Sequence, residues 1–258
     1  MSERRGRRRW WALGALGALG AGVLAVAVVA ALVWEGVLWP NRLATDDYDV
    51  RGVDVSAYQG EIDWPVLAGQ DLDFAFIKAT EGSSHVDERF AANWAGARET
   101  DLLVGAYHFL SFESPGEDQA AHLIGQVPAT TGALAPVVDV EYYGDFAADP
   151  PSVTELRGIL DPMLEALEAH YGAPPTIYTT QEMREVYLGA EYDRYPLWIR
   201  SVVLSPEVPR QEWEFWQYSD RDTLHGYAGE EEHIDMNVFD GTLEDLRAMT
   251  LPGNGSAK

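Results

Sequence analysis

Short apolar segments with strand-like composition alternate with amphipathic helical segments over residues 50–249. This alternation constrains the fold most, because strands separated by helices form parallel sheets. The strand-like segments lie at 51–58, 74–80, 102–109, 135–141, 175–180, 196–202, 214–219 and 234–239. Amphipathic helices are expected at 87–100, 116–127, 152–170 and 181–190. The pattern predicts an α/β fold, a TIM-like β/α barrel rather than a β-sandwich.

The last third of this barrel is expected to be irregular. The connections 203–213 and 220–233 are too short or too polar for full helices. Barrels of about 200–250 residues are commonly single domains, so residues 50–249 are expected to form one domain, and residues 250–258 a loose tail.

A long uncharged segment precedes the barrel. Residues 12–34 contain no charged side chain, and in a helix their 23 residues would cover the ~30 Å hydrocarbon core of a bilayer. The basic segment 1–11 would stay in the cytoplasm, so the later residues would be exported. We expect one transmembrane helix at 12–34, followed by a polar linker at 35–49. A cleaved signal peptide or a twin-arginine signal would equally export the domain, which would then be secreted.

Charge and residue usage exclude several function classes. The net charge is −24, and the first ten residues carry five arginines and one glutamate, so the rest of the chain is more acidic still. Such a body repels phosphate backbones and anionic lipid, so we expect no nucleic-acid partner and membrane contact only through 12–34. The chain has no cysteine, and its histidines and glycines form no zinc or nucleotide-binding motif. We therefore expect no metal and no cofactor.

Polar and aromatic residues gather where the strand-like segments end, which is where β/α barrels carry their catalytic groups. They predict an acidic cup with an aromatic rim. Alternative interpretations are a structural carboxylate for Asp54, a plain ion pair for Lys78 with Glu81, and a structural role for His108. The candidates are Asp54, Lys78, Glu81, Tyr107, His108, Phe109, Asp139, Glu141, Tyr178, Trp198, Trp216, Gln217, Tyr218, Asp235 and Asn237.

Asp139 and Glu141 give the sharpest chemical signal. Residues two apart on a strand share a face, so both carboxyl groups should face the barrel mouth. Two acids so close cannot both ionise freely, and the pKa of one should rise. A raised-pKa acid beside an ionised one is the arrangement that glycoside cleavage needs. A solvated pair on an edge strand is the alternative, which the apolar neighbours disfavour.

The motifs together resemble glycoside hydrolase family 25, the Chalaropsis-type lysozymes or N-acetylmuramidases. The resemblance spans residues 51–241, and it is the order and spacing of the motifs that make it specific. The motifs are GVDVSAYQGEIDW (52–64), FIKATEG (76–82), DERFAANWAGAR (87–98), VGAYHF (104–109), PVVDVE (136–141), TIYTT (176–180), FWQYS (215–219) and IDMNVFDG (234–241).

The resemblance implies an irregular β/α barrel that cleaves the β-1,4 bond between N-acetylmuramic acid and N-acetylglucosamine in peptidoglycan. It implies that Glu141 is the general acid/base, Asp139 its neighbouring carboxylate, and Asp54 and Asp235 two further active-site aspartates. The sugar groove would be lined by Tyr107, Phe109, Tyr178, Trp216, Gln217 and Tyr218. With Trp198, Lys78 and Glu81 these complete the expected site.

The chain departs from the family pattern in two segments. After Trp198 the usual small residues and aromatic are replaced by Ile199-Arg200-Ser201-Val202, and 220–233 is longer and more acidic than usual. Both departures are expected near the groove rim.

Mechanism and function leave alternatives open. Two acids on one strand face favour attack by the substrate's own N-acetyl oxygen with retention, but direct attack by another carboxylate such as Asp235 is also possible. Rival functions are a non-catalytic glycan-binding module, a hydrolase of chitin or another N-acetylated glycan, and a membrane-tethered wall-assembly scaffold. A monomer on the outer face of a bacterial cell membrane is expected, although the sequence leaves the oligomeric state open.

Overall fold

The computed structural model describes residues 20–29, 31–33 and 39–252. The chain divides into two compact units, Met1–Pro40 and Asn41–Lys258. In the first unit, residues 20–29 and 31–33 are helical. No helix within the described residues is long and apolar enough to cross a membrane. The expected span 12–34 lies partly outside the described residues, and the basic segment 1–11 lies wholly outside them.

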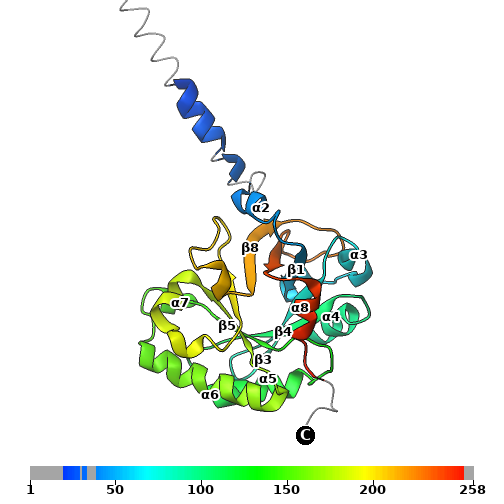
Figure 1. Cartoon of the computed structure of the whole chain (residues 1–258), viewed down its shortest axis with the longest axis vertical. Coiled ribbons are helices and arrows are strands. Elements are labelled where there is room, and N and C mark those ends of the chain that lie inside the picture. Colours follow the sequence, from blue (N-terminus) through cyan, green and yellow to red (C-terminus); the bar gives the residue numbers. More distant parts are fainter. Residues whose placement is uncertain (1–19, 30, 34–38, 253–258) are drawn as a thin grey trace, which may run out of the picture. The chain divides into compact units, whose positions relative to one another are not determined.

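The second unit is a closed barrel of eight strands (Figure 1). The strand order is β1-β9-β8-β7-β6-β5-β4-β2, and a parallel pairing of β1 with β2 closes the barrel. A short strand, β3 (His85–Val86), adds to the end of β2 as a hairpin. The barrel strands are β1 (Val50–Val55), β2 (Phe74–Glu81), β4 (Leu103–Phe109), β5 (Val137–Val140), β6 (Thr176–Thr180), β7 (Leu197–Arg200), β8 (Phe215–Asp222) and β9 (Ile234–Phe239). The predicted barrel is confirmed.

The barrel differs from a regular TIM barrel at β9, which runs antiparallel to both β8 and β1. No residue between β8 and β9 is helical in the described chain, so nothing carries the chain back across the barrel. The irregularity expected in this region is therefore a reversed strand. As a consequence the start of β9, not its end, lies at the barrel mouth, and Asp235 pairs in register with Asp54 of β1.

Helices cover the outside of the barrel. The four expected helices are present, and α3 and α8 were not anticipated. The longest, α6, begins at a capping box in which Ser152 and Glu155 satisfy each other's backbone groups, and it ends at Gly172 in the left-handed region (φ 72°). The helices are α3 (Trp64–Ala68), α4 (Phe90–Ala97), α5 (Gly116–Gln126), α6 (Val153–Tyr171), α7 (Gln181–Tyr187) and α8 (Leu243–Ala248).

Aromatic side chains fill the lower part of the barrel. Phe76 stacks on Trp198 with ring centroids 4.7 Å apart. Gly52 and Gly105 make room for this floor, because a Cβ at either position would lie 2.5 Å from a phenylalanine ring. The floor supports the polar residues above it. It consists of Val50, Phe74, Phe76, Leu134, Val137, Tyr178, Trp198, Phe215, Phe239 and Leu246.

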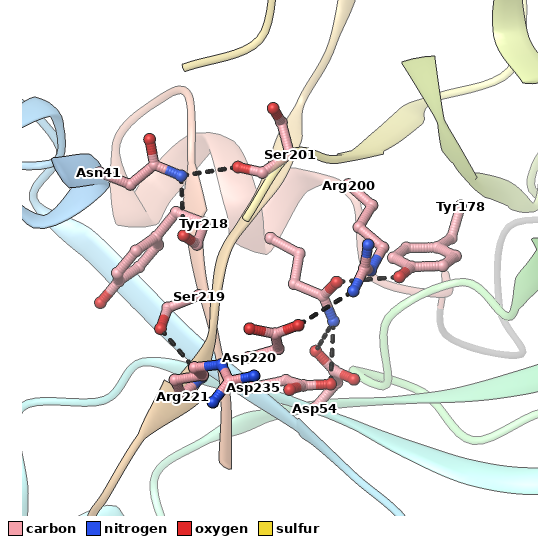
Figure 2. Close-up of polar contacts among 11 residues, drawn as sticks. Asn41, Asp54, Tyr178, Arg200, Ser201, Tyr218, Ser219, Asp220, Arg221 and Asp235 are labelled. Carbon is pink, nitrogen blue, oxygen red and sulfur yellow. Dashed lines mark hydrogen bonds and ion pairs between the residues drawn. The ribbon is translucent and has the colours of Figure 1, made fainter. Parts of the chain in front are cut away.

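The folded body begins before Val50. Asn41, in the short helix α2 (Pro40–Ala44), is 1% exposed. Its Nδ2 donates to the carbonyl oxygens of Ser201 and Tyr218 at 2.7 and 2.9 Å (Figure 2). Tyr48 packs against Trp216. Residues 41–49, which we expected to belong to a linker, therefore form part of the folded unit, because they supply buried contacts that polarity alone does not reveal.

Candidate active site

The four expected acids line one cavity at the barrel mouth. Asp54 lies near the end of β1, Asp139 on β5, Glu141 directly after β5, and Asp235 near the start of β9. They face a common cavity of about 640 Å³. Side chains alternate between the two faces of a strand, which explains this placement. The acids face the cavity, whereas their neighbours Val53, Val138 and Val140 pack in the outer core.

Most of the expected groove residues line the same cavity, namely Lys78, Glu81, Tyr107, Phe109, Tyr178, Trp198 and Gln217. Trp198 is 2% exposed and belongs mainly to the floor. Residues that the sequence analysis did not single out also line the cavity. They are Ser56, Tyr58, Gln59, Tyr143, Asp220, Arg221, Glu231 and His233. Asp220 and Arg221 lie in the last part of β8, and the others lie in the connections next to strands. Polarity in such segments is too common a signal to identify them.

Trp216 and Tyr218 do not line the cavity, so the prediction that they bind sugar is wrong in its placement. Both are buried in the outer core, where Trp216 contacts Trp213 and Tyr48. Alternation along β8 explains this, because Gln217 points inward and its two neighbours must then point outward. The motif FWQYS contributes one side chain to the mouth rather than three.

An amide network holds Asp54 and Asp235 (Figure 2). Gln217 Nε2 donates to Asp54 Oδ2 at 2.9 Å and to Asp235 Oδ2 at 3.1 Å, while Gln217 Oε1 accepts from the Tyr178 hydroxyl at 2.9 Å. Asn237 Nδ2 also donates to Asp54 Oδ2, at 2.8 Å. Burial raises the pKa of Asp54, although these donors oppose the rise. Burial and the charge of Asp54 raise the pKa of Asp235 well above its usual range, so Asp235 holds a proton more readily.

Asp139 and Glu141 have different surroundings. Asp139 is 6% exposed, and its Oδ1 has no protein hydrogen-bond partner among the described residues. Burial, followed by the charges of Glu141 and Asp54, raises its pKa well above the usual range. Burial also raises the pKa of Glu141, but Arg200 and Lys78 oppose that rise. Burial therefore favours the protonated form of both acids, and the charge of Glu141 further opposes ionisation of the more buried Asp139.

The structure agrees with an ion pair between Lys78 and Glu81 and with a structural role for His108. Lys78 Nζ contacts Glu81 Oε2 at 2.8 Å, an ion pair at the edge of the cavity. His108 points away from the mouth and is fully buried, with its ring nitrogens 2.7 Å from Thr80 Oγ1 and 3.0 Å from Gln119 Oε1. Burial lowers its pKa to about 4. His108 is thus a neutral structural histidine.

Comparison with known proteins shows which proteins the chain resembles in sequence and fold. Residues 53–227 match the model of the glycosyl hydrolases family 25. The chain is 37% identical over 207 residues to the uncharacterized protein YegX of Escherichia coli strain K12, covering 78% of this chain and 73% of that protein. It is 32% identical over 215 residues to lysozyme M1 of Streptomyces globisporus, covering 79% of this chain and 72% of that protein.

A solved structure shows the same architecture. The family 25 glycosyl hydrolase of Bacillus anthracis superposes with a TM-score of 0.74 at 47% sequence identity, covering 79% of this chain and 94% of the other.

Proposed function

The chain belongs to the glycosyl hydrolases family 25, and we propose that it cleaves the β-1,4 bond between N-acetylmuramic acid and N-acetylglucosamine in peptidoglycan. The observation that carries this proposal is the placement of four carboxyl groups, including the same-face pair Asp139 and Glu141, in one mouth cavity. Tyr107, Phe109 and Tyr143 at that cavity offer ring faces and edges to the sugar.

We propose that Glu141 protonates the leaving oxygen while the substrate's own N-acetyl oxygen attacks C1. The glycosidic C1–O bond breaks, the new C1–O bond closes a five-membered oxazolinium ring, and the Glu141 proton goes to the leaving oxygen. Glu141 then takes a proton from water, whose oxygen opens the ring and restores the acetamide. Substrate-assisted hydrolysis of this kind is one of the known exceptions to the two-carboxylate scheme.

In this scheme Asp139 stabilises the attacking acetamide. An ionised Asp139 would accept the acetamide N–H and oppose the positive charge that develops on the ring. A hydrogen bond to the charged form favours ionisation, so substrate binding would draw the proton of the pair from Asp139 to Glu141. The unpartnered Oδ1 of Asp139 is the acceptor available for this contact.

The alternative nucleophile, Asp235, is less suited to attack. Its pKa is raised well above the usual range by burial and by Asp54, and a protonated carboxyl is a poor nucleophile. Gln217 also holds its Oδ2 at 3.1 Å. We propose that Asp54 and Asp235, fixed by Gln217, shape the acidic wall of the cavity.

We further propose that residues 12–34 anchor the enzyme in the bacterial cell membrane, with the barrel outside and residues 1–11 in the cytoplasm. The arginines before the uncharged segment support this orientation. Membrane tethering would place the enzyme at the wall of its own cell.

Release of reducing ends from purified peptidoglycan tests the activity. Residues 41–258 provide the folded unit, and chitin oligomers serve as the competing substrate. We expect release from peptidoglycan to exceed release from chitin. Faster cleavage of chitin would reassign the substrate, and release from neither would favour the glycan-binding or scaffold alternatives.

A further inference from the structure

An ion pair joins the two segments in which the sequence departs from the family pattern. Arg200 belongs to the first departure and Asp220 to the second. Arg200 Nη2 lies 3.1 Å from Asp220 Oδ2 (Figure 2). Two unusual segments that meet in one contact at the mouth point to a shared task.

The barrel holds Arg200 beside residues that line the mouth, namely Gln217 and Asp220. Arg200 is the last residue of β7, in register with Thr180 of β6 and Gln217 of β8. It lies two residues after Trp198, so its side chain shares the inward face above the aromatic floor. The side chain is 34% exposed, and it lies near Tyr178 (Figure 2).

The surrounding charges are unbalanced. Arg200 and Lys78 come from β7 and β2, which are four strands apart and therefore opposite each other in the barrel order. Lys78 is already paired with Glu81. The titratable and charged groups that line the mouth are Asp54 from β1, Tyr58 after it, Lys78 and Glu81 from β2, Tyr107 from β4, Asp139 from β5, Glu141 and Tyr143 after it, Tyr178 from β6, Asp220 and Arg221 from β8, Glu231 and His233 before β9, and Asp235 from β9.

We propose that Arg200, held in place by Asp220, is a positioning residue of the reaction: its fixed positive charge sets the protonation of the catalytic acids and so the pH range of catalysis. This inference rests on the proposed function. The charge of Arg200 acts in the same direction on all four acids. It opposes the rise in the pKa of Asp54, Asp139, Glu141 and Asp235. For Glu141 it is the largest favourable charge.

The test compares the pH dependence of kcat/KM on purified peptidoglycan for Arg200→Gln, Arg200→Lys and Asp220→Asn in the full chain. Loss of a nearby cation raises the pKa of an acid, so Arg200→Gln should move both limbs of the profile to higher pH by about half a unit to one unit. Arg200→Lys should stay near the parent profile. Asp220→Asn removes an anion and also frees Arg200, so its effect on the limbs is compared in the parent and in the Arg200→Gln background, where only the loss of the anion remains and the limbs should move to lower pH.

Arg194→Gln is the matched control, because Arg194 forms an ion pair with Glu168 on α6, outside the mouth. A similar shift in this control, or a uniform loss of rate in Arg200→Gln with unchanged limbs, would overturn the inference. If Arg200→Gln does not fold, Arg200→Met takes its place, because it also removes the charge and keeps an unbranched side chain. Titration of the carboxyl groups followed by NMR measures the same pKa shifts without any need for activity. If the parent enzyme were inactive, the proposed function would be refuted, and the NMR titration would still test the role of Arg200.

Discussion

Asp139 on β5 and Glu141 directly after this strand face one cavity, yet their surroundings differ. Asp139 is the more deeply buried, and one of its oxygens has no protein donor among the described residues. Glu141 is partly exposed, and the charges of Arg200 and Lys78 oppose the rise in its pKa that burial causes. At the residue scale, the proposed mechanism requires Glu141 to carry the proton, because Glu141 protonates the leaving oxygen. Contact between the substrate acetamide and Asp139 favours the ionised form of Asp139, and so favours the proton on Glu141.

Glu141→Gln should lower kcat by about 10²–10⁴-fold, the usual contribution of general acid catalysis, because the amide has no proton of suitable acidity. Glycan binding, measured by calorimetry, should persist. Glu165→Gln is the control, since Glu165 is exposed on α6. Near-normal turnover of Glu141→Gln on intact peptidoglycan would remove this residue from the role.

Asp139→Asn should lose activity severely, because a neutral amide cannot oppose the charge on the oxazolinium ring. At neutral pH it should nevertheless be more stable than the parent. A carboxyl whose folded pKa is raised contributes stability that is complete below the unfolded pKa and is lost as pH rises through the folded pKa. The variant should therefore gain about 2–4 °C in Tm at neutral pH, corresponding to ~1 kcal/mol, and little below pH ~4. Equal gains at both pH values would contradict the raised pKa.

At the element scale, β5 limits the stereochemistry of the reaction. Residues two apart on a strand lie ~6.6–7 Å apart at Cα and project from the same face, so Asp139 and Glu141 cannot enclose the anomeric carbon from opposite sides. The reversed strand β9 fixes a second pair of acids. Because β9 runs antiparallel to β1, Asp235 near its start pairs in register with Asp54 and lies beside it.

If the acetamido oxygen is the nucleophile, the first product should retain the β configuration. Proton NMR of the freshly released reducing end follows the anomer directly. A substrate with a hydroxyl in place of the 2-acetamido group should react far more slowly. An α anomer appearing first would instead mean inversion, with water as the direct attacker and Asp139 or Asp54 as its base.

The aromatic floor should tolerate no added methyl group. A Cβ at Gly105 would lie 2.5 Å from the Phe76 ring and 3.1 Å from Leu134 Cβ. Gly105→Ala should therefore cost about 1–3 kcal/mol of unfolding free energy by overpacking. Gly125→Ala, in helix α5 with open space around it, should be neutral or stabilising by up to ~1 kcal/mol. Denaturant titration compares the two, and equal costs would argue against a tightly packed floor.

At the scale of the whole molecule, charge separates the chain into a basic start and a strongly acidic remainder. Acidity of the body disfavours contact with anionic lipid surfaces, so tethering must come from residues 12–34 if the enzyme is anchored. Carboxyl groups also outnumber cations at the mouth, where Lys78 and Arg221 line the cavity beside the acids.

The proposed topology predicts that a reporter fused after Lys258 is active only outside the cytoplasmic membrane. The arginines at the start of the chain should hold that end inside. Amino-terminal sequencing of the mature protein separates an anchor, which keeps residues 1–34, from a cleaved signal, which removes them. A reporter active only in the cytoplasm would refute export in either form.

The sequence by itself predicted the barrel, the approximate positions of its strands and the four candidate acids. Periodicity is a local property, so the alternation of Val138, Asp139, Val140 and Glu141 predicted which side chains share a face. The family motifs located Asp54 and Asp235 in the same way.

Tertiary structure alone decided which contacts cross the mouth. Local pattern did not reveal that β9 is reversed, that Trp216 and Tyr218 pack outward, or that residues 41–49 join the body, because each depends on partners far away in the chain. The contact of Arg200 with Asp220 likewise exists only because β7 and β8 lie side by side. Closure of the barrel sets which strands pair and which side chains are buried, and a short stretch of sequence does not contain that information.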